Sequence, residues 1–220
     1  GNNEQFLRYL WEVKSVSIGR GSKWVLCARG GAFRRWYGNI LEVIDWSDSA
    51  RAHYKSDKIS RIVPEYIRFR KGISWSRIAS ADIGFRLLSE TELFEKTGVS
   101  IFIKDESSFE YTIALLNTCV TRALMNLITQ VITLQVRDVF SIPYIYSEEY
   151  NIPVRRSVCN NIGISKEDWD SFETSWDFTT LPMLSLDHRA ETLDATYARL
   201  HAHWQGMTIE MQRLEEENNS

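Results

Sequence analysis

The residues in this sequence that are best suited to chemistry are arginines, aromatic residues and glycines. Residues 30–39 read GGAFRRWYGN, and residues 70–77 read RKGISWSR. Glycine lets a backbone amide approach a phosphate closely, arginine can fork onto phosphate or guanine, and asparagine can pair with adenine. A serine hydroxyl can add a hydrogen bond to phosphate. These residue types in two short groups predict a site that binds DNA.

The candidate DNA-binding residues come from these two groups and from a third short motif, Gly84-Phe85-Arg86. They are Gly30, Gly31, Arg34, Arg35, Tyr37, Asn39, Arg70, Lys71, Ser76, Arg77 and Arg86. If they bind DNA, their cationic side chains should converge on one concave face. The spacing is equally compatible with a glycine-rich turn whose Phe33, Trp36 and Trp75 lie in the core and whose arginines point into water.

Other patterns give little support for catalysis. Gly19-Arg20-Gly21 lacks the third glycine of a dinucleotide-binding motif, so we interpret it as a turn. Glu12-Val13-Lys14 resembles the end of a metal-dependent nuclease motif, but no acidic residue precedes it at a suitable distance. His201 and His203 would point to different sides of a helix. We therefore predict no catalytic and no metal-binding residues in this chain, and we keep a nuclease only as a third hypothesis.

The charge of the chain is unevenly distributed. The formal net charge is −3, yet residues 1–105 hold 18 Lys and Arg against 12 Asp and Glu, and residues 106–220 hold 8 against 17. A basic first half can offer a face to phosphates. The sequence has no run of about 18 apolar residues and no signal-like N-terminus, so it predicts a cytoplasmic protein without a membrane segment. The three cysteines form no CxxC pair, which favours free thiols.

The first half of the chain predicts strands and turns. Residues 11–18, 23–27 and 41–46 are short, β-prone segments bounded by turn residues, and no amphipathic helix is evident between them. A mixed or antiparallel sheet follows from this pattern. Ser107 and Glu110 form a capping box that opens a helix over 108–128, and 132–145 returns to strand-like composition.

The second half predicts helices. A boundary near Ser147 divides a β-rich domain at 1–147 from an acidic helical segment at 148–220, which makes the fold class α+β with packed helices. Ser165 and Asp168 predict a helix over 166–178. Apolar residues spaced alternately by three and four predict a heptad helix over 186–217. Because that helix ends in uncapped glutamates, we expect it to continue in a longer polypeptide.

Five segments of this sequence resemble the BREX adenine-specific DNA methyltransferases of the PglX family. They are GGAFRRWYGN, GISWSRIAS with Gly84-Phe85-Arg86, ALLNT, LQVRDVFSIP and the acidic SKEDWDSFETSWDF, and they follow the family order. The resemblance covers nearly the whole chain. GGAFRRWYGN and DWDSFETSWDF are long and specific, whereas ALLNT and SIP are short.

The resemblance implies that this chain is the C-terminal target-recognition region of such an enzyme, in a bacterial restriction-modification or phage-defence system. The family methylates adenine N6 with the cofactor SAM in a domain upstream. The four prolines here are isolated, so the Asn/Asp-Pro-Pro-aromatic tetrad of amino-methyltransferases is absent. The implied partners are double-stranded DNA, the upstream methyltransferase domain and possibly other defence-system proteins, with no cofactor held by this chain itself.

A second reading assigns the chain to protein interaction. The heptad helix and the acidic second half could dock onto the methyltransferase domain or another defence component. Both readings stay open at this point, because a narrow apolar stripe is equally able to pack within the same chain.

Overall fold

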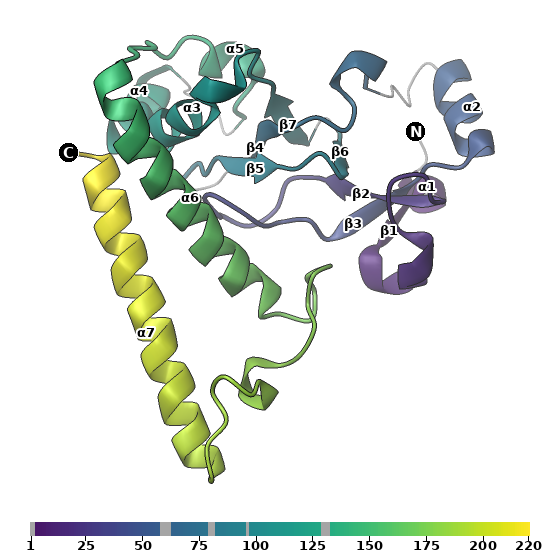
Figure 1. Ribbon diagram of the computed structural model, residues 1–220. Helices are drawn as coiled ribbons and strands as arrows, with labels where there is room; N and C mark the ends of the chain where they lie inside the picture. Colours follow the sequence, from purple (N-terminus) through teal and green to yellow (C-terminus); the bar gives the residue numbers. More distant parts are fainter. Residues whose placement is uncertain (1–2, 58–62, 79–81, 96, 129–132) are drawn as a thin grey trace.

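The computed structural model describes residues 3–57, 63–78, 82–95, 97–128 and 133–220. It shows two small β-sheets with helices packed around them (Figure 1). The predicted α+β fold class is confirmed. None of the described helices is long and apolar enough to cross a membrane.

The first sheet has the strand order β1-β3-β2-β6. Its strands are β1 (Leu7–Tyr9), β2 (Trp24–Ala28), β3 (Glu42–Asp45) and β6 (Glu92–Phe94). Strands β1 and β2 each run antiparallel to β3, whereas β6 pairs with β2 in parallel. The β-branched residues Val25 and Val43 favour strands, and both are completely buried in this sheet.

The second sheet has the order β5-β4-β7 and is antiparallel throughout. Its strands are β4 (Gly72–Ser76), β5 (Arg86–Leu88) and β7 (Gly98–Ile101). Every residue of β4 from Gly72 to Trp75 is buried. A central strand that is covered on both faces reads as a continuous buried run rather than an alternating one.

The predicted strands were partly right. β2 and β3 confirm the strands predicted over 23–27 and 41–46. The strand predicted over 11–18 was wrong, because that stretch contains two 3-10 turns, Leu10–Glu12 and Ser15–Ser17. The Glu12 carboxylate accepts a hydrogen bond from the Tyr9 amide at 2.7 Å, so a local side-chain bond replaces a strand ladder.

Helix α2 (Asp48–Ser56) was missed and lies between β3 and β4. The Ser47 hydroxyl caps it by accepting from the Ala50 amide at 3.3 Å. This helix follows the last of the three predicted strand segments, so it does not contradict the expectation of no amphipathic helix between them. A short helix α1 (Asn3–Phe6) also precedes β1.

The single helix predicted over 108–128 is two helices, α3 (Phe109–Leu116) and α4 (Cys119–Ile128). The Asn117 amide side chain causes the break, because it accepts from the Phe85 amide and donates to the Phe85 carbonyl, both at 3.0 Å. The Thr118 hydroxyl then accepts from the Thr121 amide at 3.1 Å and starts the second helix. Apolar residues continue at spacings of three and four through the break, so the sequence pattern alone predicted one continuous helix.

The strand predicted over 132–145 was also wrong within the described residues. Helix α5 (Val136–Val139) lies there, and the Asp138 carboxylate caps it by accepting from the Gln135 amide at 2.8 Å. Residue 132 itself lies outside the described residues. A local capping bond outweighed the strand propensity of the sequence.

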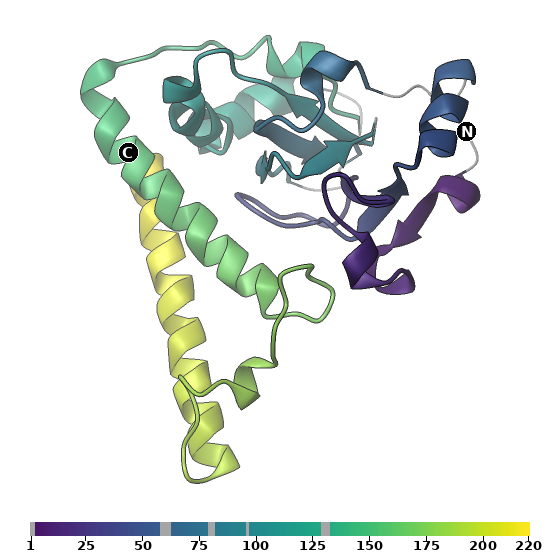
Figure 2. The same ribbon diagram turned by 45° about the vertical axis from the view of Figure 1, so that its right-hand side comes forward.

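The second half of the chain forms a hairpin of two long helices, α6 (Glu148–Asp170) and α7 (Leu193–Asn218). Figure 2 shows them in contact near the C-terminus and diverging toward the connection between them. The helix predicted over 166–178 is wrong, because α6 already begins at Glu148 and ends at Asp170. Ser165 is therefore buried inside a helix rather than capping one.

Helix α7 starts at Leu193, seven residues later than the start predicted from the heptad pattern. The Thr192 hydroxyl caps it by accepting from the Ala195 amide at 3.1 Å, and the Thr196 hydroxyl accepts from the Ala190 amide at 3.0 Å. These bonds hold the preceding segment in a turn. Leu200 and Leu214 of the predicted seam are buried.

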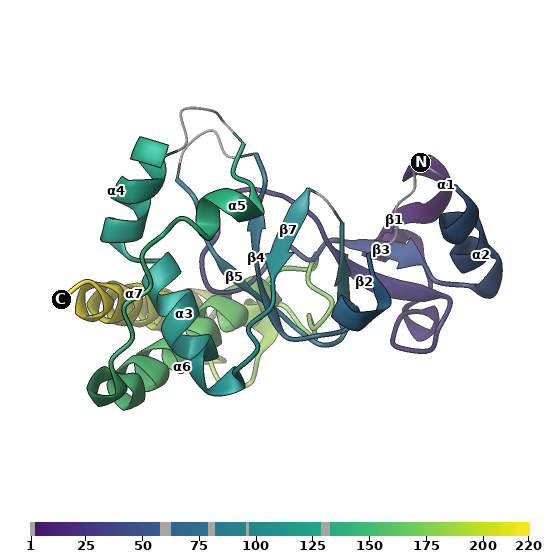
Figure 3. The same ribbon diagram turned by 90° about the horizontal axis from the view of Figure 1, so that it is seen from above.

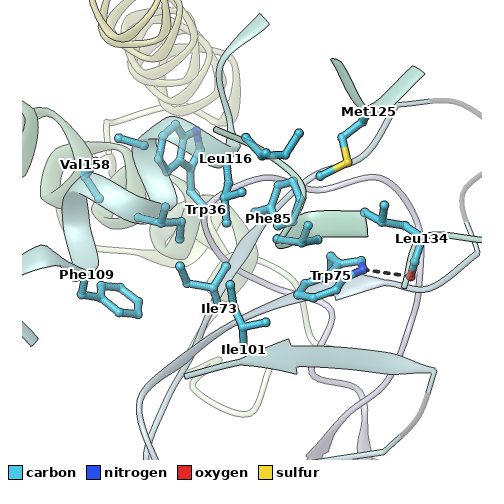
Figure 4. Close-up of a cluster of buried hydrophobic side chains, with 14 residues drawn as sticks. Trp36, Ile73, Trp75, Phe85, Ile101, Phe109, Leu116, Met125, Leu134 and Val158 are labelled. Atoms are coloured by element: carbon cyan, nitrogen blue, oxygen red, sulfur yellow. Dashed lines mark hydrogen bonds between the residues drawn. The ribbon is translucent and has the colours of Figure 1, made fainter. Parts of the chain in front are cut away.

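The largest core cluster lies between the second sheet, α3 and α6. Ile73, Trp75 and Phe85 from the sheet region pack with Phe109 of α3 and Val158 of α6, as Figure 4 shows. The buried Trp75 ring nitrogen donates to the Leu134 carbonyl at 3.2 Å. Seen from above, the hairpin lies on one side of the sheets and α2 on the opposite side (Figure 3).

Candidate nucleic-acid interface

The loop that carries GGAFRRWYGN has an unusual backbone. Trp36 and Asn39 have positive φ angles of 67° and 65°, a conformation that costs free energy in residues other than glycine. Asn39 compensates locally, because its side-chain amide donates to the Ala32 carbonyl at 2.7 Å. Trp36 bonds through its backbone to Phe85 and Leu87, which ties the loop to β5. The loop is thus shaped by specific bonds.

Five of the predicted site residues meet at the end of β4: Gly30, Gly31, Ser76, Arg77 and Arg86. We call them the β4-end cluster. The Gly31 amide and carbonyl both bond the Ser76 hydroxyl at 3.1 Å. The Arg86 guanidinium donates to the same hydroxyl at 3.3 Å, and the Arg77 amide donates to the Thr97 carbonyl at 3.0 Å.

Gly31 is required by close packing in this cluster. A Cβ at that position would lie 2.9 Å from the side chain of Asn39. A glycine without side-chain bulk leaves its neighbouring backbone exposed, as a loop that approaches a phosphate must.

Arg86 is a buried cation, with only 3% of its surface exposed. Burial, together with repulsion from the charge of Arg34, lowers the pKa of Arg86 to about 10. It donates hydrogen bonds to the Ser76 hydroxyl and the Arg34 carbonyl, and within the described residues it pairs with no carboxylate. The guanidinium therefore keeps its positive charge at neutral pH and contributes an uncompensated field to the cluster.

Arg34 and Arg35 lie outside the β4-end cluster, and both contact the helical hairpin. Arg34 pairs with Asp168 and lies over the Trp169 ring, 4.9 Å from its centre. Arg35 pairs with Glu215 at 2.6 Å. The carboxylates of α6 and α7 thus neutralise both arginines.

Two neighbouring aromatic residues strengthen the same contact. The Trp36 ring nitrogen donates to Glu215 at 2.9 Å. Lys166 of α6 lies 5.1 Å from the centre of the Tyr37 ring, and burial raises the pKa of Tyr37 to about 12. Arg34, Arg35 and Tyr37 therefore belong to the interface between the loop and the hairpin.

The remaining two predicted cations precede β4. Lys71 pairs with the buried Glu110 at 3.1 Å and lies over the Phe109 ring. Arg70 is exposed, with its guanidinium 6.0 Å from the centre of the Phe102 ring. The expected convergence on one concave face is not met, since Arg70 and Arg77 flank opposite ends of β4 and three other cations are paired with carboxylates.

Two arginines with similar surroundings to Arg70 were missed from the sequence. Arg20 lies 5.2 Å from the centre of the Phe69 ring, and Arg68 lies 5.6 Å from that of Trp46. These aromatic partners are 49 and 22 residues away along the chain, so no local spacing signals the pairs. The only available signal was the basic excess of the first half.

A cavity of about 860 Å³ lies between this loop and the hairpin. Its wall is mainly apolar and includes Phe33, Phe172, Trp204, Met207 and Met211. Phe33 is about half exposed, whereas Trp36 and Trp75 lie in the core. The alternative interpretation of a turn anchored by core aromatics is therefore correct for two of its three rings.

The described residues hold no group of three His, Cys, Asp or Glu placed to bind a metal ion. His203 bonds Glu167 at 2.7 Å across the hairpin, and its ring lies 4.8 Å from that of His188. The cysteines are free, and burial strongly raises the pKa of the Cys27 thiol.

Comparison with known proteins places this geometry in context. The chain is 30% identical over its whole length to the adenine-specific methyltransferase PglX of Lacticaseibacillus casei (strain Zhang). Over 81% of its length it is 29% identical to the adenine-specific methyltransferase BrxX of Escherichia coli O9:H4 (strain HS). The resemblance to the PglX family is confirmed.

The chain spans about a fifth of the length of the first relative, and the matched part of the second is 15% of its length. No family model matches the chain. The similarity therefore concerns one segment of much longer methyltransferases.

Proposed function

We propose that this chain recognises the DNA target of an adenine-specific methyltransferase in a bacterial BREX-type defence system. The similarity to PglX and BrxX supports the methyltransferase context. The basic first half and the loop with GGAFRRWYGN support a role in contacting double-stranded DNA.

The observation that carries the proposal is the charge of the β4-end cluster. Arg77 is partly exposed, and the buried Arg86 bonds the Ser76 hydroxyl of the same cluster with no carboxylate partner among the described residues. The Gly31 amide and the Ser76 hydroxyl bond each other in the free chain, so the Arg77 guanidinium is the group of this cluster best placed to donate to a phosphate oxygen. Tertiary contacts already occupy Arg34, Arg35 and Lys71 in the free chain.

Methyl transfer is assigned to the part of such an enzyme that lies outside this chain. In the relatives' class of reaction SAM supplies the methyl group, but the isolated prolines Pro64, Pro143, Pro153 and Pro182 cannot form the tetrad that holds an adenine amino group. Extrusion of the target base from the duplex would be completed by the catalytic part.

The proposal is tested by DNA binding at low and moderate salt. Fluorescence anisotropy with a random-sequence duplex should show salt-sensitive binding by the wild-type chain, and Arg77→Ala should weaken it. Arg189→Ala, which removes an exposed arginine from the far end of the hairpin, is the matched control and should bind like wild type. Equal binding by Arg77→Ala and wild type would remove the β4-end cluster from the interface.

A second candidate function is docking onto the methyltransferase domain or another defence protein. It is favoured by exposed apolar side chains on α7, where Leu193, Tyr197 and Ile209 are 76%, 52% and 68% exposed. Trp204→Asp is the suitable test because Trp204 is partly exposed, whereas Leu200 is buried and its replacement would disturb the fold. Loss of association with a separately produced methyltransferase domain would support docking.

A further inference from the structure

We propose that Arg20, Arg68 and Arg70 form a second surface, separate from the β4-end cluster, that contacts the phosphate backbone of duplex DNA. The inference rests on the proposed function and deepens it. Each of these arginines is held over an aromatic ring rather than by a carboxylate. We call them the stacked arginines.

The aromatic partners of the first two arginines are joined to each other. The rings of Trp46 and Phe69 meet edge to face with their centres 5.9 Å apart, and Trp46 is buried. Arg20 reaches the Phe69 ring from the turn before β2, whereas Arg68 reaches the Trp46 ring from the segment before β4. The two guanidinium groups are gathered on one aromatic pair.

The backbone between Arg68 and Arg70 is strained. Phe69 has a φ of +52°, which is rare for a residue other than glycine. Such a conformation persists only where surrounding contacts hold it, and it often marks a functional segment. The Phe69 ring meets Trp46, whereas the neighbouring Arg68 and Arg70 lie over two different rings, those of Trp46 and Phe102. The Arg68 guanidinium is fixed further by donating to the Val63 carbonyl at 2.9 Å.

Stacking leaves the charge of an arginine available. A guanidinium over a ring keeps N–H groups at its edge for a phosphate oxygen, whereas pairing with a carboxylate uses them. Among the described residues none of the three stacked arginines forms an ion pair, in contrast to Arg34 and Arg35.

Two acidic residues, Asp45 and Glu65, stand close in sequence to Trp46 and to Arg68. Asp45 is directed to Lys23 at 3.9 Å, and Lys23 itself lies over the Trp24 ring. Glu65 is exposed in the turn that precedes Arg68. The three stacked arginines and Lys23 thus outnumber these two carboxylates, and fixed guanidinium groups without a carboxylate partner fit a polyanion with regularly spaced phosphates.

Backbone contacts of this kind should not depend on base sequence. Each phosphate neutralised by an arginine steepens the decrease of affinity with salt, so the number of contacts can be counted from the salt dependence. This property distinguishes the stacked arginines from residues that read bases.

The experiment measures duplex affinity of the whole chain by fluorescence anisotropy over a range of salt concentrations. The double variant Arg20→Ala with Arg68→Ala should lower the slope of log affinity against log salt by about 2, equally for unrelated duplex sequences. The double variant Arg20→Lys with Arg68→Lys should retain the wild-type slope. Arg189→Ala with Arg199→Ala removes the same net charge from exposed positions on the hairpin side and should also retain it.

The outcomes are distinguishable. If wild type does not bind duplex DNA at low salt, the proposed function fails. If wild type binds and the double alanine variant shows the same slope of log affinity against log salt as wild type, the stacked arginines do not contact the DNA backbone. If the Arg189→Ala, Arg199→Ala control lowers the slope equally, the change reflects net charge alone, and the inference is overturned. Arg20→Ala alone, in an exposed turn, gives the same test with a slope change of about 1 should the double variant unfold.

Discussion

At the scale of single residues, neighbours in sequence have different roles. Arg34 and Arg35 follow each other directly and look like a DNA-binding pair, yet each meets a carboxylate from a helix far along the chain. Arg86, which stands alone in sequence, is buried and has no carboxylate partner among the described residues. Burial and partners, rather than residue type, decide which arginine is available for a phosphate.

Glu215 is predicted to stabilise the fold. Glu215→Ala removes the partner of Arg35 and leaves the ring nitrogen of the buried Trp36 without its acceptor. An unsatisfied buried donor costs about 1–3 kcal/mol, so urea denaturation should show a loss of that order. Glu216→Ala, at the next and exposed position, should change the free energy of unfolding by less than about 0.5 kcal/mol. A similar loss in both variants would contradict the assignment.

Glu92 is predicted to make stability depend on pH. Burial raises the pKa of its carboxyl above the ordinary value of 4.5, although bonds from Ser89 oppose the shift. The folded state therefore holds a proton that the unfolded state releases, so this contribution is full below pH 4.5 and is lost as pH rises through the folded pKa.

The measurement is the urea midpoint of wild type and Glu92→Gln from pH 4 to pH 8. Wild type should lose stability relative to the variant as pH increases over this interval. Parallel pH profiles for the two proteins would show that Glu92 does not titrate as described.

At the scale of elements, close approach fixes the loop that carries GGAFRRWYGN. Gly84 lies two residues before the start of β5, and a Cβ there would be 2.2 Å from the Arg34 carbonyl oxygen. The bridge between Trp36 and Arg86 continues the same contact into β5. The loop is thus held against the sheet by backbone packing before its side chains meet the hairpin.

Gly84→Ala is predicted to displace this loop. Because the clash is with backbone atoms, the loss of stability should exceed about 2 kcal/mol in thermal or chemical denaturation. Gly163→Ala is the matched control, since nothing lies within 4 Å of a Cβ at that exposed position inside α6. It should stabilise the chain by about 0.5–1 kcal/mol through helix propensity. A neutral Gly84→Ala variant would contradict the close contact.

At the scale of the whole molecule, the helical hairpin and the sheets share one core. Val158 of α6 is fully buried in the same cluster as Ile73 of β4. At the end of α7, the Asn219 side chain accepts from the Cys119 amide at 2.6 Å, and Asn218 donates to the Ala114 carbonyl at 3.1 Å. The C-terminus of α7 therefore caps the break between α3 and α4.

We predict that the chain unfolds in one cooperative transition, although the sequence predicts two domains that meet near Ser147. A shared core couples the two parts energetically, so circular dichroism and tryptophan fluorescence should report the same midpoint. A chain shortened to residues 1–147 should lose this cooperative transition, because Trp36 and Phe109 would be exposed. Two separated transitions in the whole chain would support independent domains instead.

The sequence by itself determined the fold class, the strands β2 and β3, and the family resemblance. These depend on composition, local propensity and long motifs that need no knowledge of distant contacts. Tertiary structure alone decided the break at Asn117, which follows from a bond to Phe85, 32 residues away. It also decided the partners of Arg34 and Arg35, which are 134 and 180 residues distant. Charge compensation and burial depend on which elements meet in space, and local spacing carries no information about that.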